Sequence, residues 1–144
     1  FSPDNREYEM TSGTVSFPYR LYFVDANEEK IENLTDRQKK ILYCLYTRSN
    51  DGYLREKYAK KLLGAGLEEW CLPFIVSLCD DYVVEIVEAV CSVFSVTHYR
   101  FDCLIRAFFP LYKYKEVMSH HRRRINQMLS FLFQTFALGV FKTL

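Results

Sequence analysis

The sequence predicts an all-α fold, a short stack of about six antiparallel helices preceded by an extended N-terminal arm. Beyond residue 33, apolar residues recur at spacings of three and four, and capping residues or glycines separate these stretches. The 144 residues are 49% hydrophobic, with 12 Phe and 11 Tyr but only 5 Gly and 4 Pro, which favours an aromatic core with short turns. We therefore expect an arm over residues 1–33 and a helical domain over residues 34–144.

The arm divides into three parts by composition. Residues 1–13 are polar and predict a tail, whereas Thr14–Val24 combines the aromatic and β-branched residues that are typical of an extended segment. Pro18 lacks a backbone N–H, so this segment is expected at an edge, lying against the helices. Residues 25–33 are expected to form a turn.

The predicted helices are bounded by recognisable start and stop residues. Thr35 and Gln38 have the spacing of a capping box, in which each side chain accepts a hydrogen bond from the backbone N–H of the other residue. Asp51 starts the second helix, and Gly64 and Gly66 end it. The six expected helices span Thr35 to the turn at 49–52, Gly52–Leu63, Glu68–Cys79, Tyr82–Ser95, Thr97–Phe109 and Lys113–Leu138.

Two of these helix starts share a short pattern. Asp51–Glu56 and Asp80–Glu85 both match Asp-x-Tyr-aliphatic-x-Glu, and each lies at the start of the second helix of a predicted pair. Residues 34–63 and 67–94 therefore predict two copies of one helix-turn-helix unit.

This unit resembles the HEAT repeats of α-solenoids. The resemblance depends on Asp51, Leu54, Arg55, Ala59 and the pair Leu62-Leu63, and on the proline-bearing stretch Leu72–Leu78 in the second copy. It implies stacked helix pairs whose concave face binds protein or, less often, nucleic acid. The second copy has Val84 in place of the arginine, and Ser49 stands where many units have an additional aspartate. A short stack of about three pairs, closed by the long last helix, is therefore expected.

Arg55 lies on the apolar side of its predicted helix, between Leu54 and Tyr58. A buried charge is costly unless it is paired, so we expect a structural role for Asp51 and Arg55, with Asp51, Asp80 or Asp81 as the buried partner of the guanidinium. The alternative is that Arg55 lies in a groove and binds a carboxylate or a phosphate.

The first functional hypothesis is a protein-interaction module, acting as a scaffold or adaptor. Trp70, Tyr82 and Glu85 are expected to lie at one end of the central helix pair, and exposed aromatic residues are frequent anchors of protein interfaces. Acidic residues at helix starts are also favoured by the helix dipole without any partner. The last helix is apolar nearly all round, which suggests burial against the bundle or in a homodimer.

The alternative hypothesis is nucleic-acid binding by the basic stretch Lys113–Arg124. Arg122, Arg123 and Arg124 follow two histidines there, and two tyrosines are interleaved with lysines. A helix distributes consecutive residues around its axis, so a solvated helix with flanking ion pairs is the favoured interpretation. The net charge of +1 indicates no whole-molecule attraction for nucleic acid or for an anionic membrane.

No pattern of catalytic or cofactor-binding residues was found. The adjacent histidines point about 100° apart on a helix, so one metal ion is not expected between them. Phosphate-binding loops and nucleophile motifs are absent from the sequence. We therefore expect no enzyme activity, no metal and no cofactor. The last helix is too polar for a membrane span. The five cysteines, four of them in apolar helical stretches, suggest buried thiols in a reducing, cytoplasmic setting.

Overall fold

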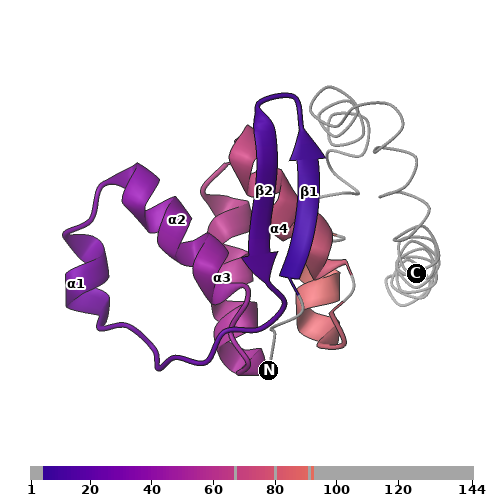
Figure 1. Cartoon of the computed structure of the whole chain (residues 1–144). Helices are drawn as coiled ribbons and strands as arrows, with labels where there is room; N and C mark the ends of the chain where they lie inside the picture. Colours follow the sequence, from indigo (N-terminus) through magenta and orange to yellow (C-terminus); the bar gives the residue numbers. More distant parts are fainter. Residues whose placement is uncertain (1–4, 67, 80, 91, 93–144) are drawn as a thin grey trace, which may run out of the picture.

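The computed structural model describes residues 5–66, 68–79, 81–90 and 92 (Figure 1). A β-hairpin comes first, a short helix and a helix pair follow, and a 3-10 turn leads into the last named helix. In chain order these are β1 Asn5–Met10, β2 Gly13–Pro18, α1 Glu28–Glu32, α2 Asp36–Tyr46, α3 Gly52–Gly64, η1 Glu69–Cys71 and α4 Leu72–Leu78. Residues 84–90 are also helical.

The prediction of an all-α stack of six helices is wrong, because an antiparallel hairpin accompanies the helices of the described chain. Residues 5–10, expected to be part of a tail, form β1 and pair with β2 in a register that places Tyr8 opposite Val15. Gly13 begins β2 with φ of +135°, a conformation that residues with a Cβ rarely adopt. Residues 28–32, expected to be a turn, form α1.

The hairpin belongs to the hydrophobic core instead of lying outside it. Figure 1 shows β1 and β2 in front of α4. Their inward side chains are Tyr8, Met10 and Phe17, and the ring of Phe17 stacks on that of Phe74 with the ring centres 4.2 Å apart. These residues share one cluster with buried side chains of α2, α3 and α4, which include Cys44, Leu62, Ile75 and Leu78.

The starts of α2 and α3 are as predicted. The N–H of Gln38 donates to the Thr35 hydroxyl at 3.3 Å, and the N–H of Thr35 donates to the Gln38 side chain at 2.9 Å, so the capping box is confirmed. At α3, the Asp51 carboxylate accepts from the N–H of Tyr53 at 2.8 Å. The two helices pack against each other. Helix α1 packs against both of them through a second buried cluster, which consists of Ile31, Tyr46 and Tyr58.

The third predicted helix is shorter and irregular at its start. Residues 69–71 form a single 3-10 turn, and α4 begins only at Leu72, with Pro73 in its first turn. The following helix also starts later than the sequence repeat requires. The repeat pairs Gly52, the first residue of α3, with Asp81, whereas the next helix begins at residue 84. The two matching sequence patterns are therefore not at equivalent positions of the two helices.

Candidate site: an arginine cluster beside an aromatic edge

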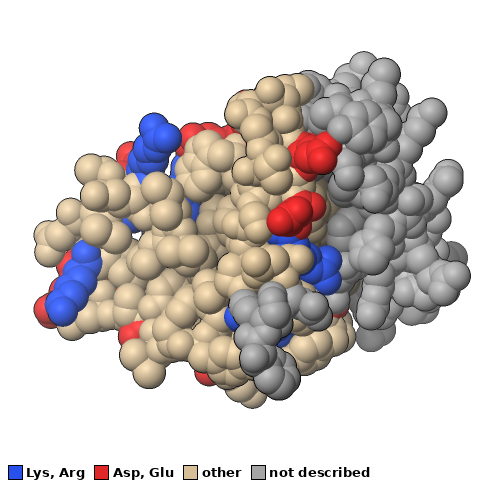
Figure 2. Space-filling view, in the orientation of Figure 1, with Lys and Arg blue, Asp and Glu red and all other residues tan. Residues whose placement is uncertain are grey.

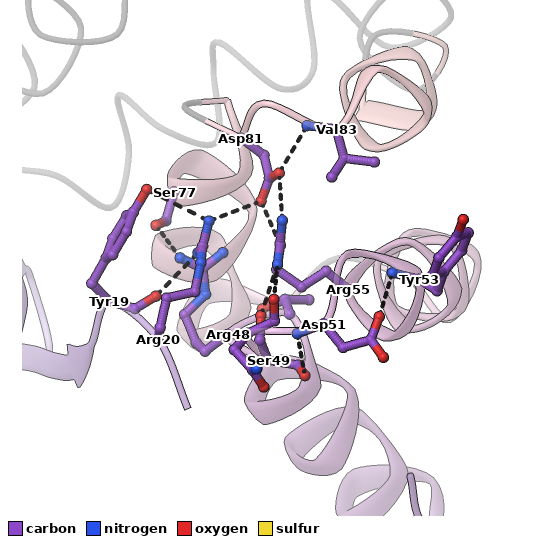
Figure 3. Close-up of polar contacts among 12 residues, drawn as sticks. Tyr19, Arg20, Arg48, Ser49, Asp51, Tyr53, Arg55, Ser77, Asp81 and Val83 are labelled. Atoms are coloured by element: carbon purple, nitrogen blue, oxygen red, sulfur yellow. Dashed lines mark hydrogen bonds and ion pairs between the residues drawn. The ribbon is translucent and has the colours of Figure 1, made fainter. Parts of the chain in front are cut away.

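Four charged side chains from separate parts of the chain meet where α2, α3 and α4 end or begin (Figure 3). Arg20 follows β2, Arg48 follows α2, Arg55 lies in the second turn of α3, and Asp81 follows α4. We call Arg20, Arg48, Arg55 and Asp81 the arginine cluster. A backbone hydrogen bond joins the segments that carry Arg20 and Arg48, because the N–H of Leu21, the residue after Arg20, donates to the carbonyl of Arg48 at 2.6 Å.

Arg55 is fully buried and has its polar groups bound. Its Nε donates to one oxygen of Asp81 at 2.8 Å and its Nη2 to the other at 3.1 Å, while Nη1 donates to the carbonyls of Ser49 and Asn50, each at 3.0 Å. This two-pronged pairing is the strong form of an arginine–carboxylate bond. Arg55 therefore joins the start of α3 to the turn before it and to the chain after α4.

Asp81 is the common acceptor of the cluster. Its carboxylate also accepts from the N–H of Val83 at 3.0 Å, and Nη2 of Arg20 lies 3.5 Å away. Burial by itself would raise the pKa of this carboxyl, but the hydrogen bonds from Arg55 and Val83 outweigh burial and hold the pKa below its ordinary value. Asp81 is therefore ionised at neutral pH.

Arg48 differs from Arg55 in its pairing. Its side chain is 1% exposed, yet the one hydrogen bond it makes through a side-chain nitrogen is from Nη1 to the Ser77 hydroxyl, at 2.6 Å. Its Nε and Nη2 have no hydrogen-bond partner in the part of the chain that the structure describes. Burial, and then repulsion from Arg20, lower the pKa of Arg48 to about 10, so the guanidinium still carries its charge at neutral pH.

Three exposed apolar residues adjoin the cluster on its outer side. Tyr53 is 84% exposed, Tyr82 is 70% exposed and Val84 is 55% exposed. The helix starts that carry them lie together: the ring centre of Tyr82 is 5.1 Å from Cζ of the buried Arg55, and a Cβ built on Gly52 would lie 3.2 Å from Val83. We call Tyr53, Tyr82 and Val84 the aromatic edge.

Of the residues predicted as partner-binding, the structure describes Trp70, Tyr82 and Glu85, and it places Trp70 apart from the other two. Tyr82 and Glu85 are both exposed, just beyond α4. Trp70 lies in η1, before the other end of α4. It is half-buried, packs against the core, and donates from Nε1 to Glu68 at 2.8 Å. Arg122, Arg123 and Arg124, with the rest of the basic stretch Lys113–Arg124 and the proposed dimer helix, lie outside the described residues.

The two residues predicted to be structural occupy defined positions. The Asp51 side chain caps α3 and forms no hydrogen bond or ion pair with the Arg55 side chain. The guanidinium is bound by Asp81, another of the three acids expected as its partner. Sequence reasoning missed Arg20, Arg48 and Tyr53 as candidate residues. Tyr53 could have been found from the Asp-x-Tyr pattern, which contains Tyr53 as well as Tyr82.

The thiols of Cys44 and Cys71 interact, which raises the pKa of Cys44 and lowers the pKa of Cys71. Cys44, Cys71 and Cys79 are free and buried. Hydrogen bonding to Cys71 and burial raise the pKa of the Cys44 thiol, so it stays neutral at physiological pH. Among the described residues no group of three or more His, Cys, Asp or Glu side chains is placed to hold a metal ion.

Charge is dispersed over the visible surface. In Figure 2 most of the described face is neither acidic nor basic, and the blue side chains lie apart from one another. None of the helices between residues 5 and 92 that the structure describes is both long and apolar enough to cross a bilayer. Comparison with protein-family models, with curated proteins and with solved structures found no match to this sequence.

Proposed function

We propose that this chain is a protein-interaction domain that binds its partner through the aromatic edge. The observation that carries the proposal is the exposure of Tyr53, Tyr82 and Val84 at two helix starts that lie close together. Tyrosine buries a large apolar area and keeps a polar group for hydrogen bonding, which makes it frequent among the residues that dominate interface energies. The buried pair of Arg55 and Asp81 joins these two helix starts, and the centre of the Tyr82 ring lies 5.1 Å from Cζ of Arg55.

The rim of the edge suggests the chemistry of the partner. Asp51, Glu85 and Glu88 are exposed next to the three apolar residues, so the rim is acidic. A complementary segment would place an apolar or aromatic side chain against Tyr53 and Tyr82 and lysine or arginine residues around it. A cytoplasmic location is part of this proposal, supported by the free, buried thiols of Cys44, Cys71 and Cys79.

The proposal is tested by affinity purification with matched variants. The doubly substituted Tyr53→Ala, Tyr82→Ala chain removes both rings from the edge, whereas Tyr22→Ala removes a ring that is 80% exposed on another segment. We expect a partner that is retained by the unaltered chain and by Tyr22→Ala and lost from the double variant. Identical sets of bound proteins for all three chains would overturn the proposal, provided that circular dichroism shows all three to be folded.

A further inference from the structure

Arg48 presents an energetic problem that the fold itself does not solve. An ionised side chain inside a protein is costly unless opposite charge and hydrogen bonds replace its water shell. Asp81, the carboxylate of the arginine cluster, is bound by both Nε and Nη2 of Arg55 and acts on Arg48 from farther away. The direct contacts of the Arg48 guanidinium are with the neutral Ser77 hydroxyl and with the Phe17 ring, whose centre is 5.7 Å from Cζ. The guanidinium therefore lacks a counter-charge in direct contact within the described chain.

The unpartnered atoms of Arg48 are the two that bind an oxyanion. The N–H groups of Nε and of one Nη point the same way along one edge of the planar guanidinium, and together they match two oxygens of a carboxylate or phosphate. Arg55 uses its Nε and Nη2 in this way for the two oxygens of Asp81. In Arg48 the same edge, Nε and Nη2, is buried and has no hydrogen-bond partner among the described residues. The cluster thus contains one guanidinium edge that is paired with a carboxylate and one that is not.

The charge of the surroundings selects the occupant. Arg20, Arg48 and Arg55 contribute three positive charges and Asp81 one negative charge, which leaves two positive charges uncompensated among these four groups. A phosphate dianion supplies two negative charges and several acceptor oxygens, whereas a carboxylate supplies one charge. We propose that Arg48, with Arg20 and the Ser77 hydroxyl beside it, forms a binding site for a phosphate group, either inorganic phosphate or a phosphate monoester.

Arg20 is positioned to open this site. Of the three guanidinium side chains it is the exposed one, at 14%, against 1% for Arg48 as a residue and 0% for Arg55. Its Nη1 donates to the carbonyl of Tyr19 at 3.1 Å and its Cζ lies 4.2 Å from the centre of the Tyr19 ring, whereas its Nη2 lies 3.5 Å from the Asp81 carboxylate. Contacts of that length are weak. Tyr19 therefore holds Arg20 more firmly than Asp81 does, and a phosphate bound at Arg48 can draw Nη2 of Arg20 away from that carboxylate.

The test is to titrate the full chain with inorganic phosphate at about pH 8, where phosphate is mainly dianionic. Binding is measured by isothermal titration calorimetry and by the shift in the melting temperature. Acetate at equal ionic strength provides the carboxylate comparison, and O-phosphoserine tests the monoester. Arg48→Met removes the guanidinium and keeps an unbranched side chain. Arg37→Met makes the same change at an exposed position of α2.

We expect phosphate to raise the melting temperature of the unaltered chain and of Arg37→Met in a concentration-dependent way, and to leave Arg48→Met unchanged. Without phosphate, Arg48→Met should be at least as stable as the unaltered chain, because an unpaired buried charge has been removed. Arg20→Gln, at a partly exposed position, should bind phosphate about tenfold more weakly. A stronger response to O-phosphoserine than to inorganic phosphate identifies the monoester as the ligand, and the reverse order identifies the free anion.

Three results would overturn the proposal. The first is that phosphate gives no heat of binding and raises the melting temperature no more than acetate does, and the second is that it raises the melting temperature of Arg48→Met as much as that of the unaltered chain. If Arg48→Met does not fold, the third is that Arg20→Gln binds phosphate as tightly as the unaltered chain does. None of these measurements involves a protein partner. They leave the proposed function of the aromatic edge to its own experiment.

Discussion

The residues that define this molecule are two buried arginines in different states. Arg55 donates to both oxygens of Asp81 and to two backbone carbonyls, whereas Arg48 donates to one hydroxyl and leaves Nε and Nη2 unpartnered. The first arrangement is what stability requires of a buried charge. The second suggests a position kept for binding, because a hydrophobic residue would suit the same space at lower cost.

Replacing Arg55 alone should be strongly destabilising. Arg55→Leu leaves the Asp81 carboxylate buried, with Arg20 at 3.5 Å as its remaining cationic neighbour in the cluster. We expect a loss of about 3–5 kcal/mol in the free energy of unfolding. The double change Arg55→Leu, Asp81→Leu removes both charges and should recover most of that loss. Urea unfolding measures both, and a single variant as stable as the unaltered chain would show that the pair is not needed.

The same pair predicts how stability responds to acid. The pKa of Asp81 is lower in the folded chain than its ordinary value of 3.8, so the folded state favours the ionised form. This contribution to stability is complete above the unfolded pKa and is lost as the pH falls through the lower, folded pKa. The difference in unfolding free energy between the unaltered chain and Asp81→Asn should therefore be constant from neutral pH to about pH 5 and shrink below about pH 4. A difference that does not change with pH would contradict the assignment.

How far these residues could be predicted depends on how local their environment is. The burial of Arg55 follows from its place among apolar neighbours on one helix, and that periodicity is visible in the sequence. The choice of Asp81 over Asp51 depends on how the chain after α4 packs against the start of α3, a contact between residues 26 apart in the sequence. Arg48 lies beyond the last residue of α2, and its burial arises from the hairpin and from Ser77, which lie 29 or more residues away along the chain.

Among the secondary-structure elements, the helix caps could be predicted from the sequence and the pairing of β1 with β2 could not. The caps of α2 and α3 involve residues two or three apart, and both are present as expected. β1 contains Glu7 and Glu9, but its alternate residues Tyr8 and Met10 are buried, a period-two pattern that its charged residues obscured. A strand of this kind is stabilised by its partner strand and by the core beneath it, neither of which is local. α1, with five residues, is too short to show helical periodicity.

Removing the capping box should destabilise α2 by a moderate amount. Thr35→Ala removes the hydroxyl that accepts from the N–H of Gln38 and also bonds the Gln38 side chain. The expected loss is about 0.5–2 kcal/mol of unfolding free energy. Thr35→Ser keeps a hydroxyl at the same position and should behave nearly as the unaltered chain does. If thermal unfolding shows equal losses for the two variants, the hydroxyl is not the cause.

At the scale of the whole molecule, the hairpin and the helices stabilise one another. Phe17 of β2 stacks on Phe74 of α4 and lies near Arg48, so the hairpin covers both the core and the arginine cluster. The turn of the hairpin is held as well, since Thr11 and Ser12 in it donate to Glu69. These contacts explain why the N-terminal segment is a folded layer where an extended arm was expected.

The stack of Phe17 on Phe74 should be measurable as a coupling between the two layers. We propose a double-mutant cycle with Phe17→Leu and Phe74→Leu, which removes the rings and keeps apolar bulk. The double variant should be about 0.5–1.5 kcal/mol more stable than the sum of the single losses predicts. Strictly additive losses in urea unfolding would show that the hairpin and α4 are energetically independent at this contact.

The central claim is that the aromatic edge is where another protein binds, and photo-cross-linking tests it most directly. A photoreactive phenylalanine derivative is placed at Tyr53 in one chain and at Tyr22, which is equally open to solvent, in another. The account predicts a covalent adduct with one partner from position 53, lost when Tyr82→Ala is added, and none from position 22. Equal adducts from both positions, or an adduct at 53 that Tyr82→Ala leaves unchanged, would contradict it.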